Sequence, residues 1–265
     1  MKVLKMHVAS VRRRTDRVRL LNAEVDDITM DELLETFTEG MLLTLHVDML
    51  MKLQKDKEFF DILPRFDVIT CDSHILYLAS KFLGRPVRER VSGSDFFPRY
   101  YMCHKDNSAV TIFLCGGSPG VAEIARERIN EKVGREMIVG TFAPHYGFDE
   151  DPDEISRIIS AVNESRATAL LVGLGGGRQE KFIVKFRDRF EYVRTFLPLG
   201  GTIDYEAETL RRPPAWITNV GLEWFYRLLK EPRLRWRRYL LHQPPIIYLL
   251  LMQKLGLYKN PFESS

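Results

Sequence analysis

The chain has 265 residues, of which 45% are hydrophobic and 28% charged, and its formal net charge is +3. This composition is typical of a globular protein and excludes a disordered one, and the length allows one large α/β domain, or a domain of ordinary size with an appendage. No apolar run reaches the roughly 18 residues of a membrane span, and the N-terminus lacks the apolar core of a signal peptide, so we expect neither a spanning helix nor secretion.

Short apolar runs alternate with amphipathic segments over most of the chain. This rhythm favours a parallel sheet with helices on both faces. We expect a first strand within 17–25 and then a helix that begins at the capping box Thr29–Glu32. The other expected strands are 42–45, 67–71, 110–115, 137–142, 169–173 and 192–197, and the other expected helices are 49–60, 74–84, 121–133, 151–164 and one after Glu180.

Three of the expected strands run into glycine-bearing turns, at 116–120, 173–177 and 200–201. A strand, a glycine turn and a helix together present free backbone N–H groups, which suit a phosphate or nucleotide, although turn glycines are also common for purely structural reasons. The dinucleotide pattern G-x-G-x-x-G fails because position 178 is Arg, so a nucleotide diphosphate fits better than NAD. The chain has no P-loop and no G-x-S-x-G elbow, which argues against kinase and serine-hydrolase chemistry.

Two carboxylates lie close to expected strand ends. Asp72 directly follows the apolar run 67–71, and Asp95 lies in a polar loop. Open α/β sheets carry their chemistry at the carboxyl edge of the strands, so Asp72 is a candidate general base; its alternative role is the N-cap of the helix that begins near His74. His46, His145 and the three cysteines lack metal-ligand spacing, so we predict no metal site.

The character of the chain changes near residue 208, after which prolines, tryptophans and arginines dominate. We therefore predict an α/β domain over 1–208 and a basic, aromatic helical appendage over 209–265. Basic residues interleaved with aromatic ones suit an anionic membrane surface. Nucleic acid is the rival partner, and packing of the aromatic side chains on the main domain is the structural alternative. The apolar end, 246–257, favours the membrane over nucleic acid.

Seven stretches form a pattern that spans nearly the whole chain. They are 44–50, 68–73, 89–95, 113–120, 173–180, 200–204 and 212–239. Together they resemble the WecG/TagA/CpsF family of bacterial glycosyltransferases, and the last stretch is the most specific. The resemblance implies a Rossmann-like catalytic domain over 1–208 and a metal-independent, inverting transferase without a cofactor.

The resemblance also implies the substrates and the place of action. The donor would be a UDP-sugar, such as UDP-N-acetylmannosamine, its uronic acid or UDP-glucose, and the acceptor a saccharide on polyprenyl diphosphate in cell-surface polysaccharide synthesis. The protein would be cytoplasmic, peripheral on the inner face of the membrane, and self-associating.

Residue roles follow from the same resemblance. Asp72 would deprotonate the acceptor hydroxyl, and Thr44 and Gln179 would position substrate. Four arginines would stabilise the leaving diphosphate in place of a metal: Arg212, Arg227, Arg235 and Arg238. The other matched positions would bind substrate: His46, Ser73, Arg90, Gly116, Gly117, Gly175 and Asp204.

Four residues depart from the family pattern: His46 replaces Asn, Ser73 replaces Gly, Gly177 replaces Pro and Glu208 replaces Gly. His46 and Ser73 flank the expected site. They point to an unusual sugar, or to a homologue that binds a nucleotide sugar or lipid without turnover. An NAD-type oxidoreductase is a third alternative, which the failed dinucleotide pattern disfavours.

Overall fold

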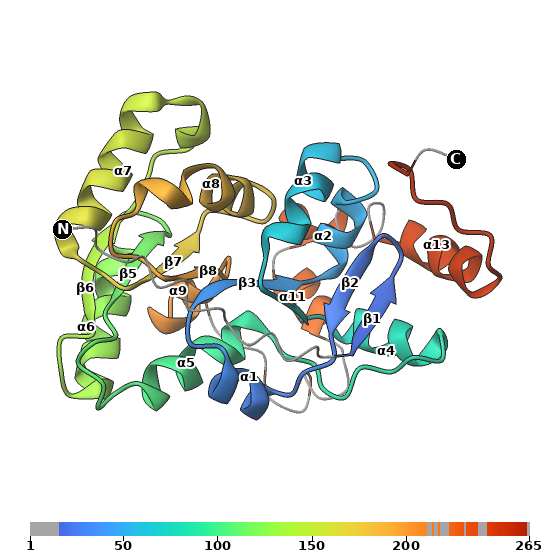
Figure 1. Cartoon of the computed structure of the whole chain (residues 1–265), viewed down its shortest axis with the longest axis horizontal. Coiled ribbons are helices and arrows are strands. Elements are labelled where there is room, and N and C mark those ends of the chain that lie inside the picture. Colours follow the sequence, from blue (N-terminus) through green and yellow to red (C-terminus); the bar gives the residue numbers. More distant parts are fainter. Residues whose placement is uncertain are drawn as a thin grey trace, which may run out of the picture.

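Six parallel strands form the centre of the protein (Figure 1). The computed structural model describes residues 16–210, 214, 217, 223–230, 232–237 and 243–263. The order across the sheet is β4-β3-β8-β7-β5-β6. The strands are β3 (Gly40–Leu45), β4 (Val68–Cys71), β5 (Ile112–Gly116), β6 (Ile138–Phe142), β7 (Ala169–Gly173) and β8 (Thr195–Pro198). The predicted α/β, Rossmann-like class is therefore confirmed.

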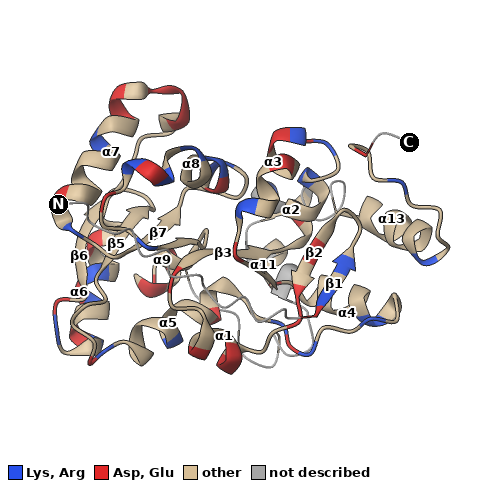
Figure 2. Cartoon of the chain, in the orientation of Figure 1, with Lys and Arg blue, Asp and Glu red and all other residues tan. Residues whose placement is uncertain are grey.

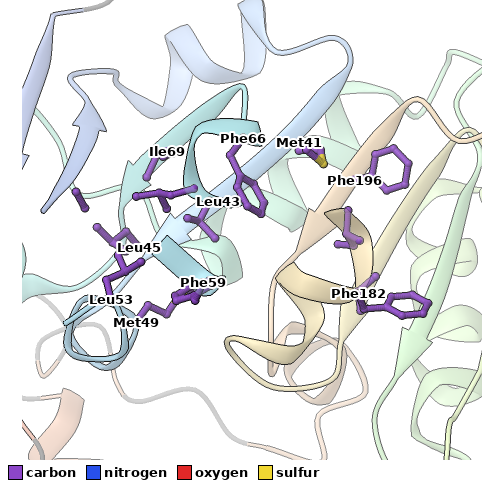
Figure 3. Packing of buried hydrophobic residues seen from close by; sticks show 14 of the residues in the cluster. Met41, Leu43, Leu45, Met49, Leu53, Phe59, Phe66, Ile69, Phe182 and Phe196 are labelled. Atoms are coloured by element: carbon purple, nitrogen blue, oxygen red, sulfur yellow. The ribbon is translucent and has the colours of Figure 1, made fainter. Parts of the chain in front are cut away.

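Side chains that alternate along each strand face two different layers of helices. Leu43 and Leu45 join one buried cluster, whereas Leu42 joins the other. Figure 3 shows the first cluster, in which Phe59 and Phe182 lie on the same face as Leu43. Its helices are α2 (Val47–Lys52), α3 (Lys57–Ile62), α4 (His74–Phe82), α7 (Pro152–Ser165) and α8 (Arg178–Phe186). The opposite face carries α1 (Met30–Thr36), α5 (Gly93–Cys103), α6 (Val121–Val133) and α9 (Thr202–Glu206).

Three local predictions were wrong. The segment expected as one strand is an antiparallel hairpin, β1 (Arg17–Leu20) and β2 (Ala23–Asp26), whose turn holds Leu21 at φ +54°. The helix expected over 49–60 is two helices, because Asp56 caps α3 through a hydrogen bond from the Phe59 N–H. Helix α5 was missed, since Gly93 and Pro98 both resemble helix breakers.

The C-terminal residues 243–263 pack on the main domain. In α13 (Pro245–Lys254), Ile246 and Leu250 are buried in the first cluster. The amide of Gln253 accepts from the Leu21 N–H at 2.8 Å and donates to the Arg19 carbonyl at 3.0 Å. Before it lie α11 (Glu223–Lys230) and α12 (Pro232–Arg237). Within the described ranges no helix is long and apolar enough to cross a membrane. The domain boundary at 208 stays a prediction.

Backbone approaches backbone where three central strands end. A Cβ atom on Gly116, whose φ is +134°, would overlap the Gly173 carbonyl oxygen. A Cβ atom on Gly173 would lie only 2.6 Å from the Gly200 carbonyl oxygen. These glycines therefore let the carboxyl ends of β5, β7 and β8 come together without intervening side chains.

We expect Gly116→Ala to destabilise the fold, because both the positive φ and the overlap with Gly173 are unfavourable. The strained backbone alone should lower the free energy of unfolding by about 1–3 kcal/mol. Gly120→Ala is the matched control, since Gly120 also has a positive φ but faces open space. Urea unfolding of both variants measures the difference. Equal losses would show that the close approach does not require glycine at 116.

Candidate active site

The parallel register of β3 and β4 sets the first half of the site. Leu45 pairs with Cys71, and the Asp72 N–H donates to the Leu45 carbonyl at 2.9 Å. His46 and Asp72 therefore follow neighbouring strand ends on one edge of the sheet. Thr44 is the residue before Leu45, at the end of β3. It is buried, and its Oγ1 lies 3.2 Å from the Cβ position of Gly93. A larger residue at 93 would crowd this hydroxyl, so the start of α5 fits closely over it.

Ser73, and not Asp72, caps α4. The Ser73 Oγ accepts from the Leu76 N–H at 3.2 Å, which satisfies one of the free donors at the helix start. The alternative role considered for Asp72 as N-cap is thus wrong. The neighbouring Cys71 is buried, and burial together with the Asp72 charge raises the pKa of its thiol to about 12. Cys71 therefore remains a neutral thiol and is no nucleophile here.

Arg90 bridges the end of β4 and the start of α5. Its Nη1 donates to the Asp72 carbonyl at 3.0 Å, and its Nη2 lies 3.3 Å from Asp95 Oδ2. The same Asp95 oxygen accepts from Ser92 Oγ at 2.7 Å. Burial lowers the pKa of His74, next to the site, and the charge of Arg90 adds to this effect. The guanidinium therefore fixes the backbone that carries Asp72.

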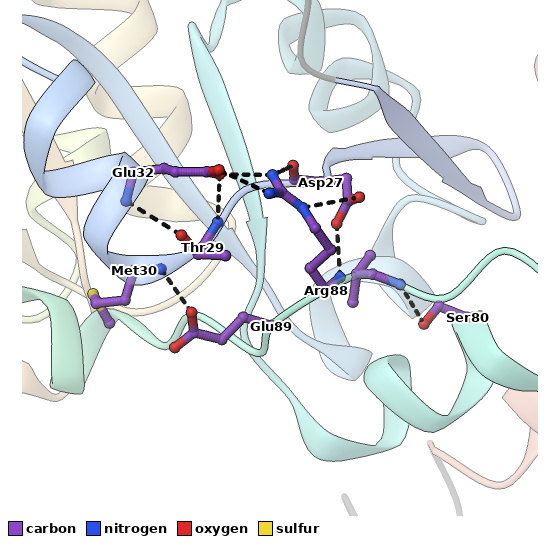
Figure 4. A network of polar contacts seen from close by, with 8 residues as sticks. Asp27, Thr29, Met30, Glu32, Ser80, Arg88 and Glu89 are labelled. Carbon is purple, nitrogen blue, oxygen red and sulfur yellow. Dashed lines mark hydrogen bonds and ion pairs between the residues drawn. The ribbon is translucent and has the colours of Figure 1, made fainter.

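The residues before Arg90 anchor its loop to α1 (Figure 4). Arg88 forms hydrogen bonds with both Glu32 carboxylate oxygens, at 2.7 and 2.6 Å, and its backbone N–H donates to Asp27 at 2.7 Å. The Glu89 carboxylate accepts from the Met30 N–H at 2.9 Å. On the other side, the Val91 N–H donates to the Cys71 carbonyl at 2.9 Å. The residues before and after Arg90 are thus fixed by hydrogen bonds, and these contacts hold Arg90 in place.

The second half of the site lies at the ends of β5 and β7, which pair with each other. The chain leaves β5 into α6 on one face of the sheet and leaves β7 into α8 on the other. Such a switch point is where open α/β sheets bind ligands. Gly116, Gly117 and Gly175 all lie here, as predicted from sequence. We call residues 174–177, which follow β7, the glycine loop.

Two buried polar side chains hold the glycine loop from inside. Gln179 Oε1 accepts from the Leu174 N–H at 3.2 Å, and Gln179 Nε2 donates to Glu180 Oε1 at 2.7 Å. Glu180 Oε2 accepts from the Gly177 N–H. Burial raises the pKa of Glu180 to about 7, against the opposing effect of these hydrogen bonds and of Lys52. The Gln179 amide, expected to position substrate, is here bonded within the loop.

The two halves of the site meet at His46. Its Nε2 lies 3.7 Å from the Cβ position of Gly176 in the glycine loop, and its Nδ1 lies 3.7 Å from Asp48 Oδ2. Lys52, on the helix that begins after His46, donates to the Gly176 carbonyl. The residues predicted on β3 and β4 are therefore joined to those predicted after β7.

Asp204 and the predicted arginines complete the inventory of expected site residues. Asp204 is half-buried in α9, and burial raises the pKa of its carboxyl. Its Oδ2 lies 3.9 Å from the Cβ position of Gly201. Arg212 and Arg238 lie outside the described residues, as do the side chains of Arg227 and Arg235. In the part of the chain that the structure describes, no group of three or more His, Cys, Asp or Glu side chains could hold a metal ion.

Comparison with known proteins identifies the family of the chain. The family model "Glycosyl transferase WecG/TagA/CpsF family" matches residues 18–260. The chain belongs to this family.

Three relatives share the name N-acetylglucosaminyldiphosphoundecaprenol N-acetyl-beta-D-mannosaminyltransferase. The protein of Bacillus subtilis (strain 168) is 28% identical over 186 residues, 70% of this chain and 69% of the relative. That of Bacillus spizizenii (strain ATCC 23059 / NRRL B-14472 / W23) is 31% identical over 179 residues, 68% of this chain and 66% of the relative. That of Staphylococcus aureus (strain MRSA252) is 22% identical over 237 residues, 86% of this chain and 88% of the relative.

Several residues at this edge of the WecG/TagA/CpsF glycosyltransferase were not expected from sequence. Tyr146 is 89% exposed, and the Arg178 guanidinium lies 5.0 Å from the centre of its ring, beside the glycine loop. His145 contacts the Tyr146 carbonyl at 2.9 Å and Asp151 at 3.0 Å, and both contacts raise its pKa. Lys52 and Glu180 reach the loop from different helices. In the sequence, His145 was considered only as a metal ligand and Glu180 only as part of the matched stretch 173–180, whereas Tyr146 is an aromatic residue in a loop after a strand.

We expect Ser73→Ala to lower the free energy of unfolding by about 1 kcal/mol, because the Leu76 N–H loses its acceptor. Ser73→Asp should keep the cap and cost much less, since aspartate is an equally good N-cap. Urea unfolding compares the two variants with the wild type. If Ser73→Ala were as stable as the wild type, Ser73 would not be the residue that caps α4.

Proposed function

We propose that the protein transfers a sugar from a UDP-sugar to a saccharide carried on polyprenyl diphosphate, in cell-surface polysaccharide synthesis. Membership of the glycosyltransferase family and the names of the relatives support this proposal. Those names describe an acceptor that is a sugar on diphosphoundecaprenol and the transfer of an N-acetylmannosaminyl group. UDP-N-acetylmannosamine is therefore the first donor to test, followed by its uronic acid and UDP-glucose.

The donor would bind with its diphosphate against the glycine turns. The β5–β7 switch point brings Gly116, Gly117 and the glycine loop together, and backbone without side chains lets a diphosphate approach closely. The sugar would then extend toward His46 and Asp72 on β3 and β4. The arrangement of these strand ends on one edge is the observation that carries the proposal.

Asp72 would act as the general base. The acceptor hydroxyl oxygen attacks the anomeric carbon, its proton passes to the Asp72 carboxylate, and the bond from that carbon to the diphosphate breaks so that UDP leaves with the electron pair. The relatives' names specify a β-linked product, which a single displacement gives from an α-linked donor. Thr44, near the end of the neighbouring strand β3, would contact the sugar or the acceptor.

Charge on the leaving UDP needs stabilisation, which we assign to Arg212, Arg227, Arg235 and Arg238 on the basis of the family pattern. Planar guanidinium groups bind diphosphate oxygens in pairs, so several of them could replace a metal ion. Transfer would then continue in the presence of EDTA.

We expect Asp72→Asn to reduce turnover by about 10²-fold or more, with UDP binding nearly unchanged, because the amide cannot take up the proton. The measurement is UDP release by purified full-length protein with the three donors, a short-chain lipid-diphosphate sugar acceptor and EDTA. Asp95→Asn is the control, since Asp95 contacts Ser92 and Arg90. It should retain more activity than Asp72→Asn.

Other outcomes of this assay decide between the alternatives. Unchanged turnover in Asp72→Asn would remove Asp72 from the mechanism. UDP binding by the wild type without release from any donor would favour a homologue that binds nucleotide sugar without turnover. Loss of transfer in EDTA would contradict the metal-independent scheme.

The C-terminal residues would place the enzyme on the cytoplasmic face of the membrane, where a lipid-linked acceptor is found. While Ile246 and Leu250 of α13 are buried, the side chains of Ile247, Tyr248 and Leu251 are 63%, 62% and 46% exposed. Figure 2 shows that α13 is almost free of charge along its length. Exposed Leu78 and Phe82 on α4 extend this surface, because Lys254 of α13 lies over the Phe82 ring. An apolar surface with neighbouring lysines suits an anionic bilayer.

We expect the double variant Ile247→Glu and Leu251→Glu to lower binding to vesicles of phosphatidylcholine and phosphatidylglycerol by about tenfold or more. Each inserted side chain should contribute about 1.5–3 kcal/mol, and a glutamate is also repelled by the anionic lipid. Vesicle flotation measures the bound fraction. Ile124→Glu is the control, because Ile124 is 41% exposed but lies on α6, on the opposite face of the sheet. Equal binding of all three proteins would assign the membrane contact elsewhere.

A further inference from the structure

The peptide group between Gly176 and Gly177 is held at both of its polar ends. Its carbonyl oxygen accepts from Lys52 Nζ of α2, and its N–H donates to the Glu180 carboxylate of α8. Because a carbonyl and the following N–H lie in one rigid plane, these two contacts together fix the rotation of that plane. The residues on either side are glycines, so the plane would otherwise rotate at little cost.

Glu180 needs both of its carboxylate oxygens for this arrangement. One accepts from the Gly177 N–H, and the other accepts from Gln179 Nε2 at 2.7 Å. Gln179 in turn binds the Leu174 N–H. Glu180 is fully buried, so no water replaces a lost partner easily. The Glu180 carboxylate therefore holds one end of the glycine loop directly, at Gly177, and the other end through Gln179, at Leu174.

Glycine at 177 makes the contacts with Lys52 and Glu180 possible. Its φ is +93°, and a Cβ atom there would lie 2.8 Å from Lys52 Nζ. Proline, which the family pattern has at this position, holds φ near −65° and has no N–H to donate to Glu180. The two contacts with this peptide group therefore occur where this chain has glycine in place of the proline of the family pattern.

We propose that Lys52 and Glu180 are positioning residues, which fix the glycine loop in the orientation that binds the diphosphate of the donor. This inference rests on the proposed transferase function. Lys52 is exposed, and its ammonium places a positive charge beside Gly177 in the glycine loop, near His46. The nearby carboxylates of Asp56, the N-cap of α3, and Glu58 form ion pairs with Lys181, at 2.9 and 2.7 Å.

The test measures UDP affinity by calorimetry and donor KM and kcat by UDP release. Lys52→Met keeps most of the stem and removes the donor, and Glu180→Gln keeps the shape but supplies only one acceptor. Both should weaken UDP binding and raise the donor KM by about tenfold or more, with kcat changed much less. Lys52→Arg should recover part of the affinity. Lys55→Met is the matched control, an exposed lysine nearby, and should match the wild type.

An amide NMR titration of the ligand-free protein gives a readout independent of activity. The Gly177 N–H signal should shift with a midpoint near the Glu180 pKa of about 7, and this shift should vanish in Glu180→Gln. Lys52 is on the surface, so Lys52→Met keeps the inference testable even if Glu180→Gln does not fold.

The outcomes separate the inference from the proposed function. A wild type that transfers sugar, with both variants unchanged in UDP affinity and donor KM, would overturn the inference and leave the function standing. A wild type that neither transfers sugar nor binds UDP would overturn both. Weaker UDP binding in Lys52→Met and Glu180→Gln, with Lys55→Met unchanged, supports the inference even if the transferred sugar remains to be found.

Discussion

The site depends on the direct contact between backbones at the ends of β5, β7 and β8. Gly116 lies against the Gly173 carbonyl, and Gly173 lies against the Gly200 carbonyl, so that any side chain there would push the strands apart. The contact concentrates backbone polar groups at the point where α6 and α8 leave the sheet toward opposite faces. A ligand with several phosphate oxygens matches such a place better than an apolar ligand does. His46 follows β3 and Asp72 follows β4. Both lie along the same edge, because every strand in the sheet runs in the same direction.

The sequence predicts this edge well because the rule behind it is local. A buried strand is visible as an apolar run, and in a parallel sheet whatever follows each run comes to the same side. His46, Asp72, Gly116 and Gly175 could therefore be placed at this edge from the pattern of residues alone. The helix cap could not be assigned, because Asp72 and Ser73 are adjacent and both are good N-caps. Lys52 could not be found either, since its partner in the glycine loop is 124 residues away and no periodicity connects them.

Two departures from the family pattern have opposite structural meanings. Glu208 has a φ of +58°, a left-handed conformation that favours glycine, the residue that the family pattern has there. Its carboxylate lies 2.6 Å from Arg128, an exposed ion pair that offsets little of the strain. Gly177, in contrast, has a φ closed to the family's proline. At 208 this chain therefore holds a left-handed backbone without glycine, whereas at 177 it holds a backbone that proline could not adopt.

Arg90 fixes the end of β4 through contacts of two kinds with two acidic residues. Its Nη1 donates to the backbone carbonyl of Asp72, and its Nη2 lies beside the carboxylate of Asp95. Asp95 in turn accepts from Ser92, so it is bound on two sides. Asp95 thus fixes Arg90, and Arg90 fixes the end of β4. Our proposal places Asp72 at this strand end as the general base.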